Sequence, residues 1–119
     1  MKGAGAMIMK IGDKTVDVTW EENESVEELK ALAAQGLTIS LSMYGGFEQV
    51  GSIGQAITRN DVQTTTDPGD IVLYAGDQLV VFYGHNSWAY TRLGRIDLSD
   101  VELTELLSGG DVTITLSVE

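Results

Sequence analysis

The stretch GDIVLYAGDQLVVFYGHNSWAYTRLGRI, residues 69–96, contains the clearest strand pattern in the chain. Its runs at 71–75 and 78–83 are apolar at nearly every position, which is typical of strands that are covered on both faces. The Gly76-Asp77 pair between these runs predicts a tight hairpin. A third strand is expected at 88–96. The stretch therefore predicts a central antiparallel sheet.

Strand patterns continue on both sides of this stretch. Many strands in a short chain favour closure into a barrel, because closure removes exposed strand edges. We therefore predict a mostly β fold, a closed eight-stranded antiparallel barrel capped by two short helices. The further strands are expected at 7–11, 15–20, 37–44, 47–50 and 112–118, with 62–66 as an edge strand or an extended loop.

Two segments have the pattern of a helix that begins with a capping box. Ser25-Val26-Glu27-Glu28 and Ser99-Asp100-Val101-Glu102 each place a hydroxyl three residues before a glutamate, so that each side chain satisfies a free backbone N–H. The first box predicts a helix of about three turns that Gly36 ends. The second predicts a short helix that ends at Gly109.

Length and composition limit the class of protein. The chain has 119 residues, which corresponds to one domain, and its formal net charge is −11. We expect residues 1–6 (MKGAGA) to be a flexible tag or linker remnant and residues 7–119 to form the domain. The negative charge argues against nucleic acid as a partner, because binding phosphates requires the opposite sign. The apolar runs are far shorter than the roughly 20 residues that span a bilayer, so no membrane insertion is expected. We therefore expect a soluble protein that is either cytoplasmic or exported after removal of an N-terminal signal. The sequence does not distinguish between these two compartments.

Common catalytic and metal-binding patterns are missing from the sequence. It contains no cysteine and one histidine, which excludes thiolate chemistry and multi-histidine metal sites. No Walker loop and no dinucleotide-binding glycine motif occur, and no cofactor is expected. His85 has the residue type of a general base, but its GHNS turn is typical of a solvated surface histidine.

Two aromatic clusters are candidates for ligand binding. Tyr44-Gly45-Gly46-Phe47 places rings around paired glycines at the end of a strand. Tyr83, Trp88 and Tyr90 surround a polar loop, and their rings combine apolar faces with a polar edge. Any one of these rings could pack in the core, whereas several at one barrel rim would form a peptide groove.

Residues 69–96, together with YGGFEQVG at 44–51 and the closing GDVTITLSVE, resemble the small bacterial cyclophilin-like domains. The resemblance covers nearly the whole chain from Met7. It implies an eight-stranded barrel with a helix at each end and a relation to peptidyl-prolyl isomerases. Those enzymes hold a proline-containing peptide in a surface groove, where an arginine stabilises the twisted amide more strongly than the planar one.

The resemblance implies site residues one by one. Phe47 matches the phenylalanine of the pocket, Gln78 matches its glutamine, and Trp88 matches the tryptophan of the groove. Val80 stands where the family has an aromatic floor to the proline site. Ser42 falls at the position of the catalytic arginine, and a hydroxyl cannot replace the donor fork of a guanidinium.

Three functions follow as hypotheses. The first is a binding domain that presents the three matching residues and Tyr44 to an extended peptide, including proline-containing ones, or to a small ligand, with weak or absent isomerase activity. The second is an active prolyl isomerase that uses a displaced arginine, Arg59 or Arg92. The third is an interaction module whose partner binds outside the groove.

Overall fold

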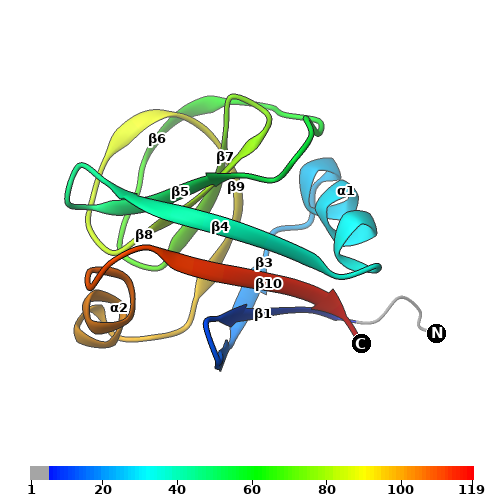
Figure 1. The fold of residues 1–119 in the computed structure, drawn as a ribbon. Helices are drawn as coiled ribbons and strands as arrows, with labels where there is room; N and C mark the ends of the chain where they lie inside the picture. The colour runs from blue at the N-terminus through cyan, green and yellow to red at the C-terminus, as the bar shows by residue number, and fades with distance from the viewer. Residues whose placement is uncertain (1–5) are drawn as a thin grey trace.

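A computed structural model describes residues 6–119 (Figure 1). The predicted remnant at 1–6 lies outside the described residues except for Ala6. The fold is mostly antiparallel β, with one helix at each end of a barrel. The elements are β1 (Met7–Ile11), β2 (Lys14–Val16), β3 (Val18–Trp20), α1 (Glu24–Ala33), β4 (Leu37–Tyr44), β5 (Glu48–Ser52), β6 (Val62–Thr65), β7 (Asp70–Tyr74), β8 (Gln78–Phe82), β9 (Ser87–Ile96), α2 (Asp100–Leu107) and β10 (Val112–Val118).

The strands form one sheet in the order β2-β1-β10-β4-β5-β8-β7-β9-β3, and β6 pairs with β9 beside this path. The predicted strand at 15–20 is broken at Asp17, because β2 pairs with β1 while β3 pairs with β9. The Asp17 carbonyl oxygen accepts a hydrogen bond of 2.9 Å from the Asp97 N–H. The chain itself thus joins the two ends of the sheet. The expected barrel is confirmed, but it is nearly rather than fully closed, and residues 6–119 contain ten strand segments instead of eight.

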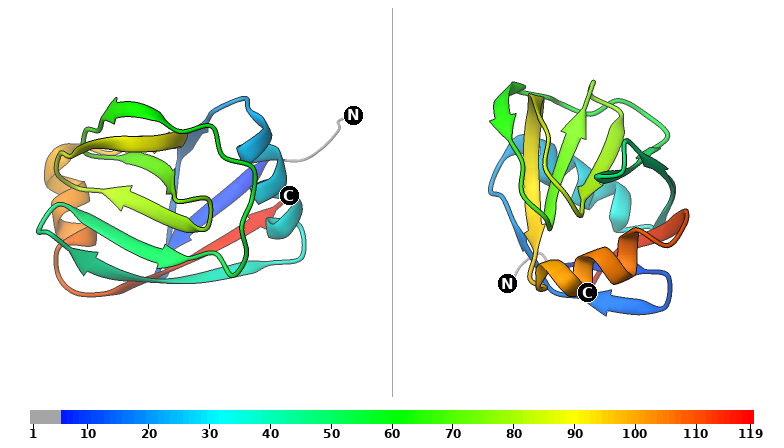
Figure 2. Two further views of the ribbon diagram at one scale, coloured as in Figure 1. Left: turned by 90° about the horizontal axis from the view of Figure 1, so that it is seen from above. Right: turned by 90° about the vertical axis from the view of Figure 1, so that its left-hand side faces the viewer.

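The main hydrophobic core fills the barrel interior. Alternate residues of the strands point inward, among them Met9, Leu79 and Ile114, and each is fully buried. Leu29 of α1 and Leu103 of α2 belong to the same core. Figures 1 and 2 show α1 and α2 at opposite ends of the barrel, as expected. Burying one such side chain contributes about 2 kcal/mol, so the helices stabilise the barrel by covering its openings.

The predicted capping box at Ser25 is wrong, because α1 begins two residues earlier. Asn23 is the N-cap, and its side-chain oxygen accepts a hydrogen bond of 2.8 Å from the Val26 N–H. Ser25 is buried, and its hydroxyl donates to the Thr58 carbonyl oxygen. Glu28 accepts from the Thr58 N–H at 2.9 Å, and hydrogen bonding by the Thr58 side chain and backbone lowers the pKa of the Glu28 carboxyl. Both predicted capping residues therefore anchor the loop after β5 to the helix.

The second capping box is confirmed, since Ser99 and Glu102 satisfy each other's backbone N–H groups. The far end of α2 is fixed to the barrel by Gln49 of β5. The Gln49 side-chain amide donates hydrogen bonds of 2.7 Å to the carbonyl oxygens of Leu107 and Gly110. This buried amide supplies the donors that the end of the helix lacks.

A second, smaller hydrophobic cluster lies on the outer face of the sheet. Val72, Val80, Phe82 and Tyr90 are buried there, with Phe47 and Val50 packed against them. The cluster extends over β5, β8, β7 and β9. No helix in residues 6–119 is long and apolar enough to cross a membrane.

Candidate functional site

A cavity of about 830 Å³ opens above this outer cluster. Its walls come from β4, β5, β7, β8 and β9 and from the adjoining turns. All four residues that the sequence singled out for ligand binding line it. The lining consists of Tyr44, Gly45, Phe47, Glu48, Val50, Tyr74, Gln78, Asn86, Trp88 and Tyr90. We call this cavity the outer pocket.

Two glycines hold Phe47 in the wall of the outer pocket. A Cβ atom on Gly45 would lie 2.2 Å from Cε2 of the Phe47 ring, and one on Gly84 would lie 2.8 Å from its Cβ. The Phe47 carbonyl oxygen accepts hydrogen bonds of 3.0 Å from the N–H groups of Tyr83 and Gly84. Gly45 also has a φ of 67°, which favours glycine. Gly45 and Gly84 thus make room for Phe47, and Gly45 also permits the turn.

Aromatic rings form a continuous arc around the outer pocket. The centroids of Tyr44 and Phe47 are 6.3 Å apart, and Phe47 stacks on Phe82 at 6.4 Å. Phe82 meets Tyr90 edge to face at 5.7 Å, and Tyr90 meets Tyr74 at 6.2 Å. These separations lie in the range in which ring pairs attract each other. Each ring is therefore fixed by its neighbours before any ligand arrives.

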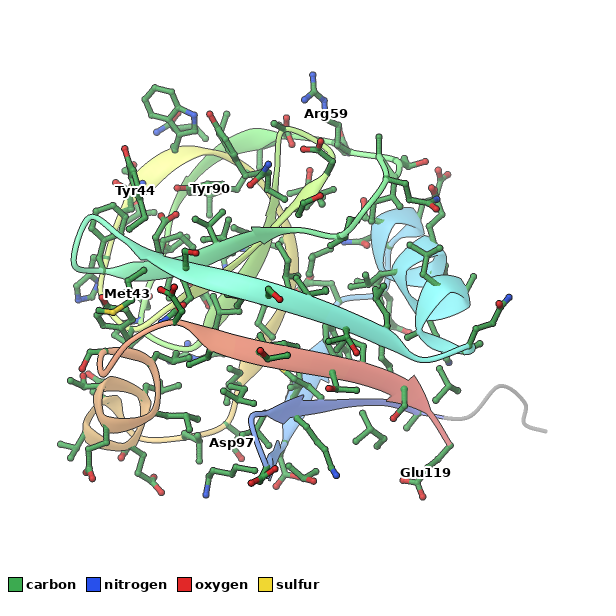
Figure 3. The ribbon with its side chains drawn as sticks, viewed as in Figure 1. Met43, Tyr44, Arg59, Tyr90, Asp97 and Glu119 are labelled. Atoms are coloured by element: carbon green, nitrogen blue, oxygen red, sulfur yellow. The ribbon has the colours of Figure 1, made fainter. Side chains whose placement is uncertain are left out.

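The rim of the outer pocket is unusually exposed for its residue types. Tyr44 is 64% exposed, Trp88 is 56% exposed and Tyr74 is 40% exposed. Figure 3 shows Tyr44 and Tyr90 on the same side of the barrel, above β4. Adjacent exposed rings around a hollow are typical of a binding surface.

Glu48, like Tyr74 and Val50, lines the outer pocket although the sequence did not single it out. It is only 7% exposed, and no hydrogen bond or ion pair joins its carboxylate to another described residue. In the ladders of β5 it lies opposite Tyr44 on one side and Phe82 on the other, so aromatic residues flank it on the same face. Burial raises the pKa of Glu48 from its ordinary value of 4.5 to about 7.

Neutral polar groups complete the walls. The Asn86 side-chain amide donates a hydrogen bond of 2.7 Å to the Tyr90 hydroxyl. Burial raises the pKa of Tyr90, so this phenol is neutral at physiological pH. Gln78 is half-buried at the start of β8 and presents a second amide to the cavity. The outer pocket therefore offers amide donors and acceptors, aromatic faces and one carboxyl group.

Among residues 6–119, no arginine lines the outer pocket. Ser42 is exposed and lies opposite Val50 in the ladder of β4 and β5. Arg92 forms an ion pair of 3.2 Å with Asp70 outside the pocket. Arg59 lies 3.6 Å from Asp61, and in Figure 3 its side chain projects away from the barrel.

Two residues considered from the sequence lie elsewhere. Tyr83 packs against the barrel core instead of the outer pocket. His85 lies at the surface, as expected, with its Nδ1 atom 3.2 Å from an Asp67 carboxylate oxygen. Among residues 6–119, no three His, Asp or Glu side chains gather as metal ligands.

The fold and the site define a cyclophilin-like barrel with a ligand-sized pocket on its outer face. The family model described as the cyclophilin-like family matches residues 9–117, and the chain belongs to this family. No curated protein and no solved structure matches the chain.

Proposed function

We propose that this chain is a binding domain that holds an extended peptide or a small ligand in the outer pocket, with weak or absent prolyl isomerase activity. One observation supports this proposal above the others. Tyr44, Phe47, Gln78 and Trp88 line a single cavity, while serine stands at position 42, which the resemblance assigns to the catalytic arginine.

The proposed low isomerase activity follows from the lack of a charged hydrogen-bond donor among the described residues of the outer pocket. An arginine that acts on the twisted amide accelerates the reaction only because it binds the transition state more strongly than the ground state. The neutral amides of Gln78 and Asn86 are weaker donors than a guanidinium. By analogy with deleted oxyanion donors, losing the arginine lowers the rate by roughly 10²–10³-fold.

An NMR titration with the proline-containing peptide Ala-Ala-Pro-Phe tests the binding function. The chain has two tryptophans, of which Trp20 is an internal reference, since its indole N–H donates to the Met7 carbonyl oxygen at 2.9 Å. We expect the Trp88 indole signal to shift and the Trp20 signal to stay. Unchanged Trp88 and Tyr44 signals at millimolar peptide would contradict peptide binding in the outer pocket.

A protease-coupled isomerisation assay tests the enzymatic alternative. We expect the peptide to isomerise at its uncatalysed rate in the presence of the wild-type chain. A faster rate that Arg59→Ala or Arg92→Ala abolishes would show that a displaced arginine reaches the substrate. Capture of a host protein equally well by the wild type and by Trp88→Ala would indicate an interaction module that does not use the groove.

A further inference from the structure

We propose that the outer pocket selects a ligand bearing a primary alkylammonium group, as on a lysine side chain, which the Glu48 carboxylate binds between aromatic walls. This proposal rests on the proposed binding function and specifies the chemistry of its ligand.

The first argument is the isolation of the Glu48 charge. Its side chain is more than nine-tenths buried, yet it has neither a cation nor a hydrogen-bond donor among the described residues. Glu48 is also the one charged residue among the described residues of the pocket wall. A buried carboxylate without a partner is costly, and adding the missing cation removes that cost. A primary ammonium supplies both the charge and three N–H donors.

The second argument is the arrangement of the rings. Tyr44 lies opposite Glu48 in the ladder of β4 and β5, and both Tyr44 and Tyr90 line the outer pocket with it. Phe82, opposite Glu48 in the other ladder, is fully buried and supports the Tyr90 ring. Aromatic faces attract a cation within about 6 Å of the ring centroid. A ring therefore adds to the attraction that the carboxylate exerts on the same ammonium group. The apolar side chain of Val50 lines the pocket beside Glu48 and suits an alkyl stem.

The third argument is that the other ligand classes fit less well. An anionic group would be repelled by Glu48 and by the net charge of −11. A neutral proline ring would leave the Glu48 carboxylate unpaired and would force it to bind a proton. An ammonium group is the occupant that satisfies the charge and the rings together.

The pH dependence follows from the groups that face Glu48. Besides Glu48, the titratable groups of the outer pocket are the phenols of Tyr44 on β4, Tyr74 on β7 and Tyr90 on β9, and burial raises the pKa of Tyr90. An alkylamine stays protonated between about pH 6 and pH 8. Because burial raises the pKa of Glu48 to about 7, its ionised fraction rises about tenfold between pH 6 and pH 8. Ammonium affinity should rise by the same factor.

The experiment compares hexylamine with 1-hexanol, which has the same alkyl chain and no charge. Both are titrated into the full chain at pH 6 and pH 8, with the Trp88 indole signal as the readout. We expect hexylamine to bind about tenfold more tightly at pH 8 than at pH 6, and hexanol to bind equally at both. Glu48→Gln should abolish this preference, whereas Glu105→Gln, which removes the same charge from the exposed face of α2, should keep it.

The possible outcomes separate this inference from the proposed function. Equal binding of amine and alcohol by the wild type, with no effect of pH, would overturn the ammonium inference and leave a neutral ligand pocket. No Trp88 response to hexylamine, hexanol or the proline peptide would overturn both. The wild-type pH dependence and the alcohol control decide the question even if Glu48→Gln does not fold.

Discussion

Ser42 lies directly opposite Val50 in the ladder between β4 and β5, and Val50 forms part of the outer pocket. Opposed residues in an antiparallel ladder point to the same face of the sheet. The position that the family resemblance assigns to the catalytic arginine is therefore on the pocket side of the barrel, two ladder positions from the pair of Tyr44 and Glu48. Position 42 is thus oriented towards the groove and carries a hydroxyl group instead of a guanidinium.

Replacing this serine by arginine should supply an internal cation to the outer pocket. We expect Ser42→Arg to lower the pKa of Glu48 and to weaken hexylamine binding at least tenfold, because the guanidinium competes for the carboxylate. The pKa is measured by NMR titration of the Glu48 side chain. Thr38→Arg is the matched control, since Thr38 lies on the same face of β4 but four residues farther from the pocket, opposite Thr115 of β10. Equal effects of both variants would indicate a general change in surface charge.

Glu48 should make stability depend on pH. Its pKa is about 7 in the folded chain against an ordinary 4.5, so the folded state binds this proton more tightly. The free energy of unfolding therefore falls as the pH rises through this interval and levels off above it. We expect Glu48→Gln to be more stable than the wild type by about 1–2 kcal/mol at pH 8, a value reduced for solvent screening at the pocket mouth, and equally stable at pH 4.

Urea unfolding at the two pH values measures this difference. Glu105→Gln should have the same free energy of unfolding as the wild type at both pH values, because Glu105 is exposed. A Glu48→Gln variant that is less stable than the wild type at pH 8 would show that the carboxylate has a stabilising partner.

The glycines before Phe47 should differ in their tolerance of a side chain. Gly45 and Gly46 both have a positive φ, 67° and 73°, so alanine is strained at each. A Cβ on Gly45 would collide with the Phe47 ring, whereas a Cβ on Gly46 has nothing within 4 Å. We expect Gly46→Ala to cost about 1 kcal/mol and Gly45→Ala to cost more and to displace the ring.

Thermal unfolding and the peptide titration measure both effects. Gly46→Ala should bind normally and Gly45→Ala should not. Equal behaviour of the two variants would mean that backbone strain, and not the position of Phe47, determines the result.

Gln49 should stabilise the fold without affecting the outer pocket. It precedes Val50 on β5 and faces the opposite side of the sheet, where its amide donates to the Leu107 and Gly110 carbonyl oxygens at the C-terminal end of α2. Gln49→Leu leaves two carbonyl groups without their donor, which costs about 2–3 kcal/mol. Gln55→Leu, in an exposed loop, should stay within about 0.5 kcal/mol of the wild type. Chemical unfolding measures stability, and a loss of hexylamine binding in folded Gln49→Leu would contradict the separation of the two faces.

The strands were predictable because their signals are local. Alternation at residues 112–118 and the apolar runs of 69–96 each identify a strand from neighbouring residues alone. The capping box at Ser99 was equally local and was predicted correctly. The box at Ser25 was not, because Asn23 is an equally good N-cap and the long-range contact with Thr58 decides between them. A pattern of four residues does not contain that contact.

The order of apolar and polar residues was sufficient to specify a β barrel with two end helices, since side-chain alternation dictates which face of each strand is buried. This pattern could not predict the break at Asp17, because the break arises from two different partner strands: β2 pairs with β1, and β3 pairs with β9. The burial of Glu48 could not be predicted from the pattern either. As a residue of β5, Glu48 looked like any surface carboxylate, and only the pairing with Tyr44 and Phe82 encloses it. The ionisation of a carboxyl group depends on what surrounds it in space, and the tertiary structure alone provides those surroundings.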